Sequence, residues 1–579
     1  MSSSRPAGGG SEVLLGVALG AIVGLSVVVW AWGELAGGVF GTGWPRVGPG
    51  QLAVTLVGLP RRLGDPAAAW PPRARHQLPP AGGFYAALGL LVVVVGAIAV
   101  SVRRAAGRFG LGSSRAGARW ARGGELSALR DGAGVRRPRP GRRRHAEGGG
   151  RLVLGRYHGR LLRAEARHAL VAFGPPQSGK SAGLAVPALL EWDGPAVASS
   201  IKTDLLATTA RRRRGVGTTF VFDPFGLSGT VAQTWSPLRA ARTWDGALET
   251  AWRLAAAGEL DQKGVDGGDF WAVAAEQRLA PLLHVAAASD LDMEAVLRWA
   301  HGQGTRELDT AVAAMTGAAS GQAELDGAHA AYDALRAFEA QADRTRTSIE
   351  ATVQGLLRAY RFRRVLDSAR SAEIDPDTLL DGCNTLYLIG DAKASKLLRP
   401  IFLALLGEVV DRAYERATLA GGRLARPLLL CLDEAGNVAP LPNLGEIAST
   451  APSHNIQIVT IFHDLAQARS RYGRQAETVI NSHRARMLLP GVADLDTLRY
   501  FADLVGEEEI RETSRTTGAG AGGGTRTSSR RRRPLLAAEG LRQLPDRHAL
   551  LLYGRLPPAV LALRMWFSDR RLRRLGGAA

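Results

Sequence analysis

The sequence contains little lysine and almost no cysteine. Only five of the 73 basic residues among 579 are lysines, so arginine supplies nearly all of the positive charge. Each lysine within a motif is therefore more informative than usual. The two cysteines, Cys383 and Cys431, lie in apolar stretches typical of strands. This excludes a disulfide framework and indicates two small buried residues in a reducing compartment.

The charge is strongly one-sided. The formal net charge is +20, which suggests a polyanionic partner, either nucleic acid or an anionic membrane surface. A second interpretation is equally compatible with the charge alone, since arginines also flank membrane spans and fill linkers. The apolar fraction of 46% is ordinary for a protein with a packed core and excludes general disorder.

Residues 1–104 are predicted to form a membrane anchor with two transmembrane helices, at 13–32 and 84–102. Each run is long and apolar enough to cross a bilayer. A signal peptide is the alternative for the first run, and a buried core helix is the alternative for the second. Arginines begin at Arg103 and Arg104, directly after the second run, which predicts a cytoplasmic C-terminal part and a cytoplasmic N-terminus.

The remaining chain divides by composition. Residues 105–150 are rich in Gly and Arg and are predicted to be a flexible linker. Segments 151–238 and 345–579 show apolar runs followed by helical patterns, which predicts one α/β domain with a mostly parallel sheet. Residues 239–344 have a helical pattern and few prolines, which predicts an all-helical insertion. The expected strands are Ala169–Phe173, Ala196–Ile201, Thr218–Phe222, Thr385–Ile389, Leu428–Leu432, Ile456–Ile461 and Ala485–Leu489.

Two further expectations concern the C-terminal part. The basic, Gly/Ser/Thr-rich stretch from Arg515 to Arg533 is predicted to be a loop. The short apolar segments Ala549–Leu552 and Ala559–Leu563, separated by two prolines, predict a final pair of β-strands.

The string GPPQSGKS fits the phosphate-binding pattern G-x-x-x-x-G-K-[ST] between an apolar strand and the start of a helix. Glycines allow the backbone N–H groups to curl toward phosphates. The lysine would neutralise the β- and γ-phosphates of ATP, and the final hydroxyl would bind Mg²⁺. A Gly/Pro turn with an incidental lysine is the alternative. The predicted nucleotide-binding residues are Gly174, Pro175, Pro176, Gln177, Ser178, Gly179, Lys180 and Ser181.

A second motif, LLLCLDEAG, ends a buried strand in two acids. Asp433 is predicted to act on Mg²⁺, and Glu434 is predicted to be the general base for the attacking water. Alone, two acids at a strand end are commonly just solvated. Gln467, beyond the strand IQIVTIF, is predicted to sense the γ-phosphate. Lys202 and Asp204 are weaker site candidates, because each is as readily a surface residue.

With these motifs in place, the chain resembles the coupling proteins of type IV secretion systems, the TraG-like conjugative DNA-transfer ATPases. Besides the two nucleotide motifs, the likeness covers IKTDL, FDPFG followed by WSPL, DFW, RTRTSIEATVQGLL and LRQLPDRHALLLYGRLPP, all in the family's order. Two positions depart from the family pattern: Ser200 replaces a frequent acidic residue, and His463 stands where the sensor strand often ends in Ser or Gln.

The resemblance implies a RecA-like P-loop ATPase that forms a homo-hexamer on the inner face of the plasma membrane. It would bring a relaxase–DNA complex or protein substrates to the channel proteins of a type IV secretion system, and the helical insertion would contact the substrate. The runner-up is a membrane-anchored double-stranded DNA translocase of the chromosome-segregation type. A third reading is a scaffold with a degenerate nucleotide site. Arg344, Arg346 and Arg399 remain open candidates for an arginine that reaches a neighbouring subunit's γ-phosphate.

Overall fold

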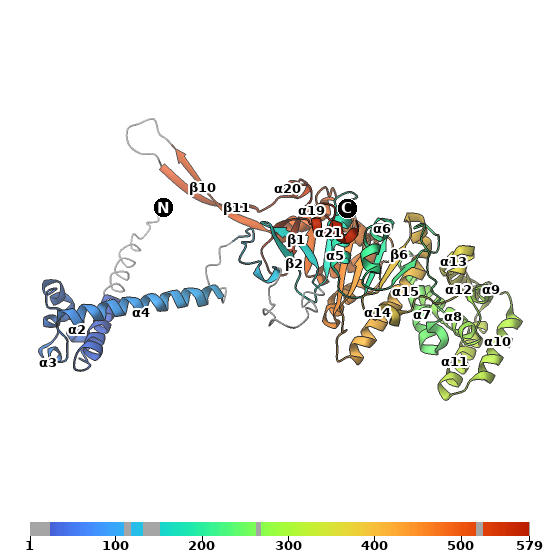
Figure 1. The fold of residues 1–579 in the computed structure, drawn as a ribbon, viewed down its shortest axis with the longest axis horizontal. Coiled ribbons are helices and arrows are strands. Elements are labelled where there is room, and N and C mark those ends of the chain that lie inside the picture. The colour runs from blue at the N-terminus through green and yellow to red at the C-terminus, as the bar shows by residue number, and fades with distance from the viewer. Residues whose placement is uncertain (1–23, 109–116, 131–150, 262–267, 517–524, 578–579) are drawn as a thin grey trace, which may run out of the picture. The chain divides into compact units, whose positions relative to one another are not determined.

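The computed structural model describes residues 24–108, 117–130, 151–261, 268–516 and 525–577 (Figure 1). The chain forms two compact units, Met1–Ala116 and Gly117–Ala579. Each unit has its own hydrophobic core and is described by itself below.

The N-terminal unit contains one helix that could span a membrane, among the residues that the structure describes. This is α4, Ala81–Arg108, whose window Ala81–Ile98 has a mean hydropathy of 2.2. It confirms the apolar helix that the sequence predicts at 84–102. The predicted span at 13–32 lies mostly outside the described residues, and the helix Gly24–Phe40 contains its C-terminal part. Two shorter helices follow, α2 (Pro49–Gly58) and α3 (Pro72–Arg75).

A cluster of aromatic rings holds this unit together. The indole N–H of Trp32 donates a 2.7 Å hydrogen bond to the carbonyl of Phe84. The ring centroids of these two residues lie 5.0 Å apart in an edge-on arrangement, and Trp70 contacts both rings. Such pairs add to the gain from burying the rings. The helix Gly24–Phe40 is thereby packed against the beginning of α4.

The second unit is built on an eleven-stranded sheet with the order β2-β1-β13-β12-β9-β3-β8-β7-β4-β6-β5. The seven strands from β9 to β5 are all parallel, and they confirm the seven strands that the sequence predicts. Their bounds are β3 Leu170–Phe173, β4 Ala196–Ser200, β5 Thr219–Phe222, β6 Thr385–Ile389, β7 Leu428–Leu432, β8 Ile456–Phe462 and β9 Ala485–Leu488.

Helices cover both faces of the parallel part, which explains why its strands are apolar throughout. Alternate residues of β3 belong to different cores: Val171 and Phe173 face one side, Leu170 and Ala172 the other. α5, α6 and α21 pack on the second side, and α15 packs on the first. The helices of the sheet region are α5 Val186–Glu191, α6 Asp204–Arg214, α15 Ala392–Leu419, α16 Leu444–Thr450, α17 Leu465–Tyr472, α18 Ala476–Ser482, α19 Leu495–Val505, α20 Ala538–Arg542 and α21 Arg570–Gly576.

Four antiparallel strands extend the sheet beyond β9. The predicted final pair is confirmed as β12, His548–Tyr553, and β13, Ala559–Ala562, with Leu550 opposite Val560. β13 pairs with β1, Val153–Tyr157, which pairs with β2, Arg160–Arg163. β1 and β2 were not predicted from the sequence, because their arginines interrupt the apolar pattern.

The predicted linker 105–150 is wrong over residues 117–130. This segment lies on the sheet unit, because the amide of Ala121 donates to the carbonyl of Pro558 at 2.9 Å and Arg130 forms a β-bridge with Leu162. Leu126 and Leu129 are buried there. A few apolar residues within a Gly/Arg-rich stretch suffice to attach it, and composition alone does not reveal them. The linker's remaining residues, except the end of α4, lie outside the described residues.

Helices fill the chain between β5 and β6, and α7–α12 gather at one end of the unit, on the side of those two strands (Figure 1). α12 crosses residue 344, where the sequence predicts the insertion to end, and two short helices follow before β6. The bounds are α7 Trp244–Asp261, α8 Gly268–Ala288, α9 Met293–Ala300, α10 Thr305–Ala318, α11 Gln322–Glu339, α12 Asp343–Leu356, α13 Arg363–Asp367 and α14 Pro376–Leu380.

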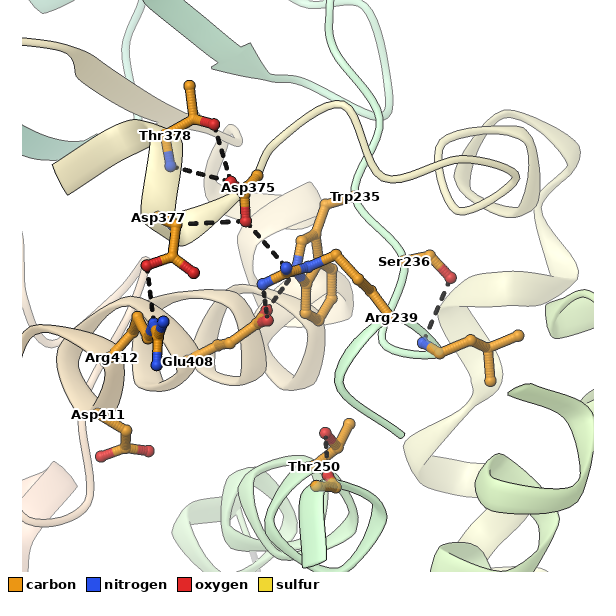
Figure 2. A network of polar contacts seen from close by, with 12 residues as sticks. Trp235, Ser236, Arg239, Thr250, Asp375, Asp377, Thr378, Glu408, Asp411 and Arg412 are labelled. Carbon is orange, nitrogen blue, oxygen red and sulfur yellow. Dashed lines mark hydrogen bonds and ion pairs between the residues drawn. The ribbon is translucent and has the colours of Figure 1, made fainter. Parts of the chain in front are cut away.

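A buried polar network ties the entrance of this helical part to the sheet helix α15 (Figure 2). Glu408 of α15 accepts a 2.7 Å hydrogen bond from the indole of Trp235 and a 2.5 Å bond from Arg239. The same guanidinium reaches Asp375 at 2.8 Å. Because Glu408 is 8% exposed, this pairing stabilises a carboxylate that would otherwise be costly to bury.

The predicted loop 515–533 is wrong at both ends. Residues Glu507–Thr516 form β10 and Thr525–Pro534 form β11, an antiparallel ribbon that projects beyond the main sheet (Figure 1). Ten residues of each strand are in register. The strands lack apolar alternation, so the turn-forming residues between them dominate the sequence pattern.

Candidate functional site

The loop Gly174–Lys180 joins β3 to a helical turn that begins at Ser181, as the sequence predicts. Glycine is favoured for steric reasons at both glycine positions of the phosphate-binding pattern. A Cβ on Gly174 would lie 2.5 Å from the hydroxyl of Ser178, and Gly179 has a φ of +89°. The loop is further anchored by the Gly174 amide, which donates to the carbonyl of Phe462 at 3.0 Å.

Lys180 is the buried cation of the site. Its side chain is 7% exposed, and its ammonium lies 2.8 Å from Nδ1 of His463 and 3.7 Å from Glu434. It also donates to the carbonyl of Gly174 at 3.3 Å. Burial lowers the pKa of Lys180, against the opposing effect of the nearby carboxylates. A bound phosphate would add a further anionic partner to the one that Glu434 supplies in this buried environment.

Ser181 and Asp433 meet across 252 positions of the sequence. The hydroxyl of Ser181 donates a 2.6 Å hydrogen bond to Oδ2 of Asp433. The other oxygen, Oδ1, is buried without a hydrogen-bond partner, and burial raises the pKa of this carboxyl. A hydroxyl and an unpartnered carboxylate oxygen are hard donors of the type that Mg²⁺ prefers, so these residues fit the predicted ion.

Glu434 follows the buried strand β7 with an unusual backbone. Its φ is +60°, which a β-carbon disfavours and which is concentrated at functional sites. Burial favours the neutral acid, but His463, the amide of Asn437 at 3.2 Å and the charge of Lys180 outweigh it, so the pKa of Glu434 is lowered. The result is an ionised carboxylate aimed into the site, suited to orient a water molecule or accept its proton.

Gln467 lies behind the site. Its side-chain oxygen accepts a 2.8 Å hydrogen bond from the backbone amide of His463, and it is absent from the residues that line the cavity. The side chain of His463 lines the cavity and contacts Lys180. The structure thus gives Gln467, the predicted sensor, a supporting position, and it places His463, which the family resemblance matches to the end of the sensor strand, at the cavity.

The cavity around the loop has a volume of about 940 Å³. Lys202 and Asp204, the weaker candidates from the sequence, also line it. Four further lining residues near the C-terminus were not predicted from the sequence: Asp546, Arg547, Met565 and Phe567. The guanidinium of Arg547 lies 5.6 Å from the centre of the Phe567 ring. A flat ring beside an arginine offers a stacking surface for a nucleotide base.

The open arginine candidates differ in accessibility. Arg399 is 1% exposed within α15, so its side chain is enclosed by this chain. Arg346 forms a 2.7 Å ion pair with Asp343, whereas Arg344 is exposed on α12. Arg344 is therefore the most accessible of the three.

The chain is similar to two conjugal transfer proteins TraG from Escherichia coli. One is 24% identical over 419 residues, covering 66% of this chain and 63% of the relative. The other is 24% identical over 417 residues, covering 68% and 64%. The chain thus matches slightly less than two thirds of the length of these relatives.

Solved structures share the fold. The bacterial conjugative coupling protein TrwBdeltaN70, in an unbound form, has a TM-score of 0.56 and 18% identity, covering 78% of this chain and 92% of that one. The plasmid coupling protein TrwB in complex with ADP and Mg²⁺ has a TM-score of 0.54 and 18% identity, covering 78% and 94%.

The model of the family described as "Type IV secretory system Conjugative DNA transfer" matches residues 132–576, most of the chain. This range includes the phosphate-binding loop, the Asp433–Glu434 motif and the helical part between them. The chain belongs to the type IV secretory system conjugative DNA transfer family.

Proposed function

We propose that this protein is a membrane-anchored ATPase that couples ATP hydrolysis to conjugative DNA transfer through a type IV secretion channel. The observation that carries the proposal is the convergence of Lys180, Ser181, Asp433 and Glu434 on one cavity of about 940 Å³. Family membership and the relatives' conjugal role favour this over a chromosome-segregation translocase. The intact set of charged residues argues against a scaffold with a degenerate site.

In this proposal the loop 174–181 holds the phosphates of ATP through its backbone N–H groups and Lys180. Ser181 and Asp433 would hold Mg²⁺, which neutralises charge on the β- and γ-phosphates when bound. Glu434 would orient the attacking water and take its proton. His463 contacts both Lys180 and Glu434. Loss of the γ-phosphate would therefore change the electrostatic surroundings of both charged groups.

The proposal extends to architecture and partners. Residues 1–104 would anchor the protein in the plasma membrane through spans at 13–32 and 84–102, with the bulk of the chain in the cytoplasm. Segments 151–238 and 345–579 would form the motor of a homo-hexamer, and 239–344 would contact the substrate. The substrate would be a relaxase–DNA complex or a protein, delivered to the channel proteins.

The proposal is tested with Lys180→Ala in the full chain. We expect ATP turnover in nanodiscs to fall by at least ~10²–10³-fold, because a buried cation aimed at the transferring phosphate is lost. Transfer of a mobilisable plasmid should fall in parallel, while the amount of protein in the membrane stays unchanged. Lys396→Ala removes an exposed lysine outside the cavity and is the matched control. Unchanged turnover in Lys180→Ala would overturn the motor assignment.

A further inference from the structure

The β10–β11 ribbon has an uneven distribution of charge. Residues 507–516 and 525–534 contain seven arginines and four glutamates, and all four glutamates lie between positions 507 and 512. The root of the ribbon is fixed to the sheet unit, since the carbonyl of Glu507 accepts from Ala118 and the amide of Leu535 donates to Gly506 at 2.9 Å. The root of the ribbon is therefore anchored to the sheet unit by backbone hydrogen bonds.

Near the root, carboxylates neutralise part of the positive charge. Arg533 lies 2.7 Å from Glu508 across the strands. Longer contacts of 3.6 Å join Arg530 to Glu509 and Arg531 to Glu512. Three of the four glutamates are used in this way.

Farther along, the register sets arginine against arginine. Arg511 lies directly opposite Arg530, and the same ladder pairs the backbone of Arg515 with that of Arg526. Like charges in directly opposed positions destabilise a two-stranded sheet by roughly 0.2–1 kcal/mol. Among the described residues, Arg511 and Arg532 form no ion pair, although Arg532 lies opposite Glu509 in the register, and both arginines are exposed. A bound polyanion would place negative charge between the arginines and so offset their mutual repulsion.

The composition of the ribbon selects among polyanions. Ile510 is the one apolar side chain on β10, and the described part of β11 before Pro534 has none, so apolar anchors of the kind that insert into a lipid interface are missing there. Thr513, Ser528 and Ser529 are exposed beside the arginines and can donate hydrogen bonds to phosphate oxygens. A two-stranded ribbon also has the width that the major groove of duplex DNA admits.

We propose that the β10–β11 ribbon binds the phosphate backbone of duplex DNA, with Arg511, Arg530 and Arg532 as its principal contacts. The inference rests on the proposed function in one respect, that DNA is the transferred substrate. It adds a surface outside the nucleotide cavity and outside the helical insertion. Arginine rather than lysine suits this role, because its planar fork can bind a phosphate through two N–H groups.

The test uses the full chain in phosphatidylcholine nanodiscs and a fluorescein-labelled 30-base-pair duplex of mixed sequence. Anisotropy is measured as a function of NaCl for the wild type and for Arg511→Ser/Arg530→Ser/Arg532→Ser. Losing three phosphate contacts should reduce the slope of log K against log salt by about 2–3 and weaken binding ~10-fold or more at low salt. Basal ATP turnover without DNA should stay unchanged, which shows that the variant folds.

Two matched variants sharpen the result. Arg423→Ser/Arg474→Ser/Arg555→Ser removes the same charge from exposed arginines outside the ribbon and outside the helical insertion, and it should change the slope by less than about 1. Arg511→Lys/Arg530→Lys/Arg532→Lys keeps the charge, so it should retain the salt slope but bind several-fold more weakly. Equal losses in the ribbon and control variants would assign the effect to net charge and overturn the ribbon's role.

The remaining outcomes separate the two proposals. If the ribbon variant bound DNA as tightly as the wild type, the ribbon would not be a DNA-binding surface, and the proposed function would be unaffected. No DNA binding by the wild type would instead contradict DNA as the substrate. Limited trypsin cleavage at the ribbon arginines adds a second readout: duplex DNA should protect them, and protection by phosphatidylglycerol nanodiscs but not by DNA would make the partner a membrane surface.

Discussion

The nucleotide site and the β10–β11 ribbon both bring opposite charges together, but they do so in different surroundings. Lys180 is 6% exposed and has Glu434 at 3.7 Å, whereas the side chain of Arg530 is 68% exposed and has Glu509 at 3.6 Å. At a given distance, the Coulomb energy of an ion pair increases as the local dielectric constant falls. The free-energy cost of leaving one charge unpaired increases as well. Nearly equal distances therefore predict very different consequences when one partner is removed.

The largest effect is expected for Glu434→Gln, which keeps the shape of the side chain and removes the ionised carboxylate. ATP should still bind, but turnover should fall by about 10²–10⁴-fold, the usual contribution of a general base. Nucleotide affinity is measured with a fluorescent ATP analogue and turnover by phosphate release. Glu446→Gln, at an exposed position on α16, is the control. Wild-type turnover in Glu434→Gln would remove this residue as the base.

A second prediction concerns a buried titratable group beside the site strands. Nε2 of His483 shares a 2.9 Å hydrogen bond with the hydroxyl of Thr460 on β8, and Nδ1 lies 2.7 Å from the carbonyl oxygen of Val479. Burial lowers its pKa from 6.5 to about 4. Above pH 6.5 the group is neutral in both states. As pH falls from 6.5 toward 4, the unfolded chain takes up a proton that the folded chain refuses, so the free energy of unfolding decreases.

The expected loss for His483 reaches about 3 kcal/mol across that window. His483→Gln should flatten the decrease, measured as urea midpoints by tryptophan fluorescence at pH 7.0, 6.0 and 5.0. His329→Gln, on the exposed side of α11, should leave the decrease as it is in the wild type. An equally steep decrease in His483→Gln would place the acid sensitivity in other groups.

The smallest effect is expected in the ribbon. Glu508→Gln breaks the 2.7 Å ion pair with Arg533, whose side chain is 61% exposed. The change should cost about 0.2–1 kcal/mol, and less at high salt, because water and ions screen an exposed pair. Urea midpoints at 50 mM and 500 mM NaCl measure it. A loss above about 2 kcal/mol would contradict the contrast between the two regions.

The sequence predicted the nucleotide site largely because each of its parts is local. The loop 174–181 is continuous, and Asp433–Glu434 directly follows an apolar strand. Since parallel strands end at one edge of a sheet, β3 and β7 could be expected to bring Ser181 and Asp433 together. Lys180 was predicted because it belongs to the same continuous loop, and Glu434 was predicted because it directly follows Asp433. The position of Gln467 was less predictable, because its side chain turns to the backbone of His463.

Other features left too weak a signal in the sequence. Arg547 and Phe567 reach the cavity because β12 and β13 add to the sheet beside β9. Arg547 lies in the segment LRQLPDRHALLLYGRLPP that carries part of the family likeness, but neither residue belongs to a nucleotide motif. Residues 117–130 show little apolar periodicity, yet they pack on the sheet unit. The ribbon was predicted as a loop because arginine, serine and threonine do not alternate with apolar residues there.

By itself, the sequence determined the parallel sheet and the chemical groups of the candidate nucleotide site. Apolar runs and a continuous phosphate-binding motif are formed by residues that are neighbours along the chain, so they can be recognised from the sequence alone. Only the tertiary structure decided that His463 contacts Lys180, that the C-terminal segment lines the cavity, and that Arg511 faces Arg530. Those contacts depend on strand register and on packing between distant segments, which a local pattern does not encode.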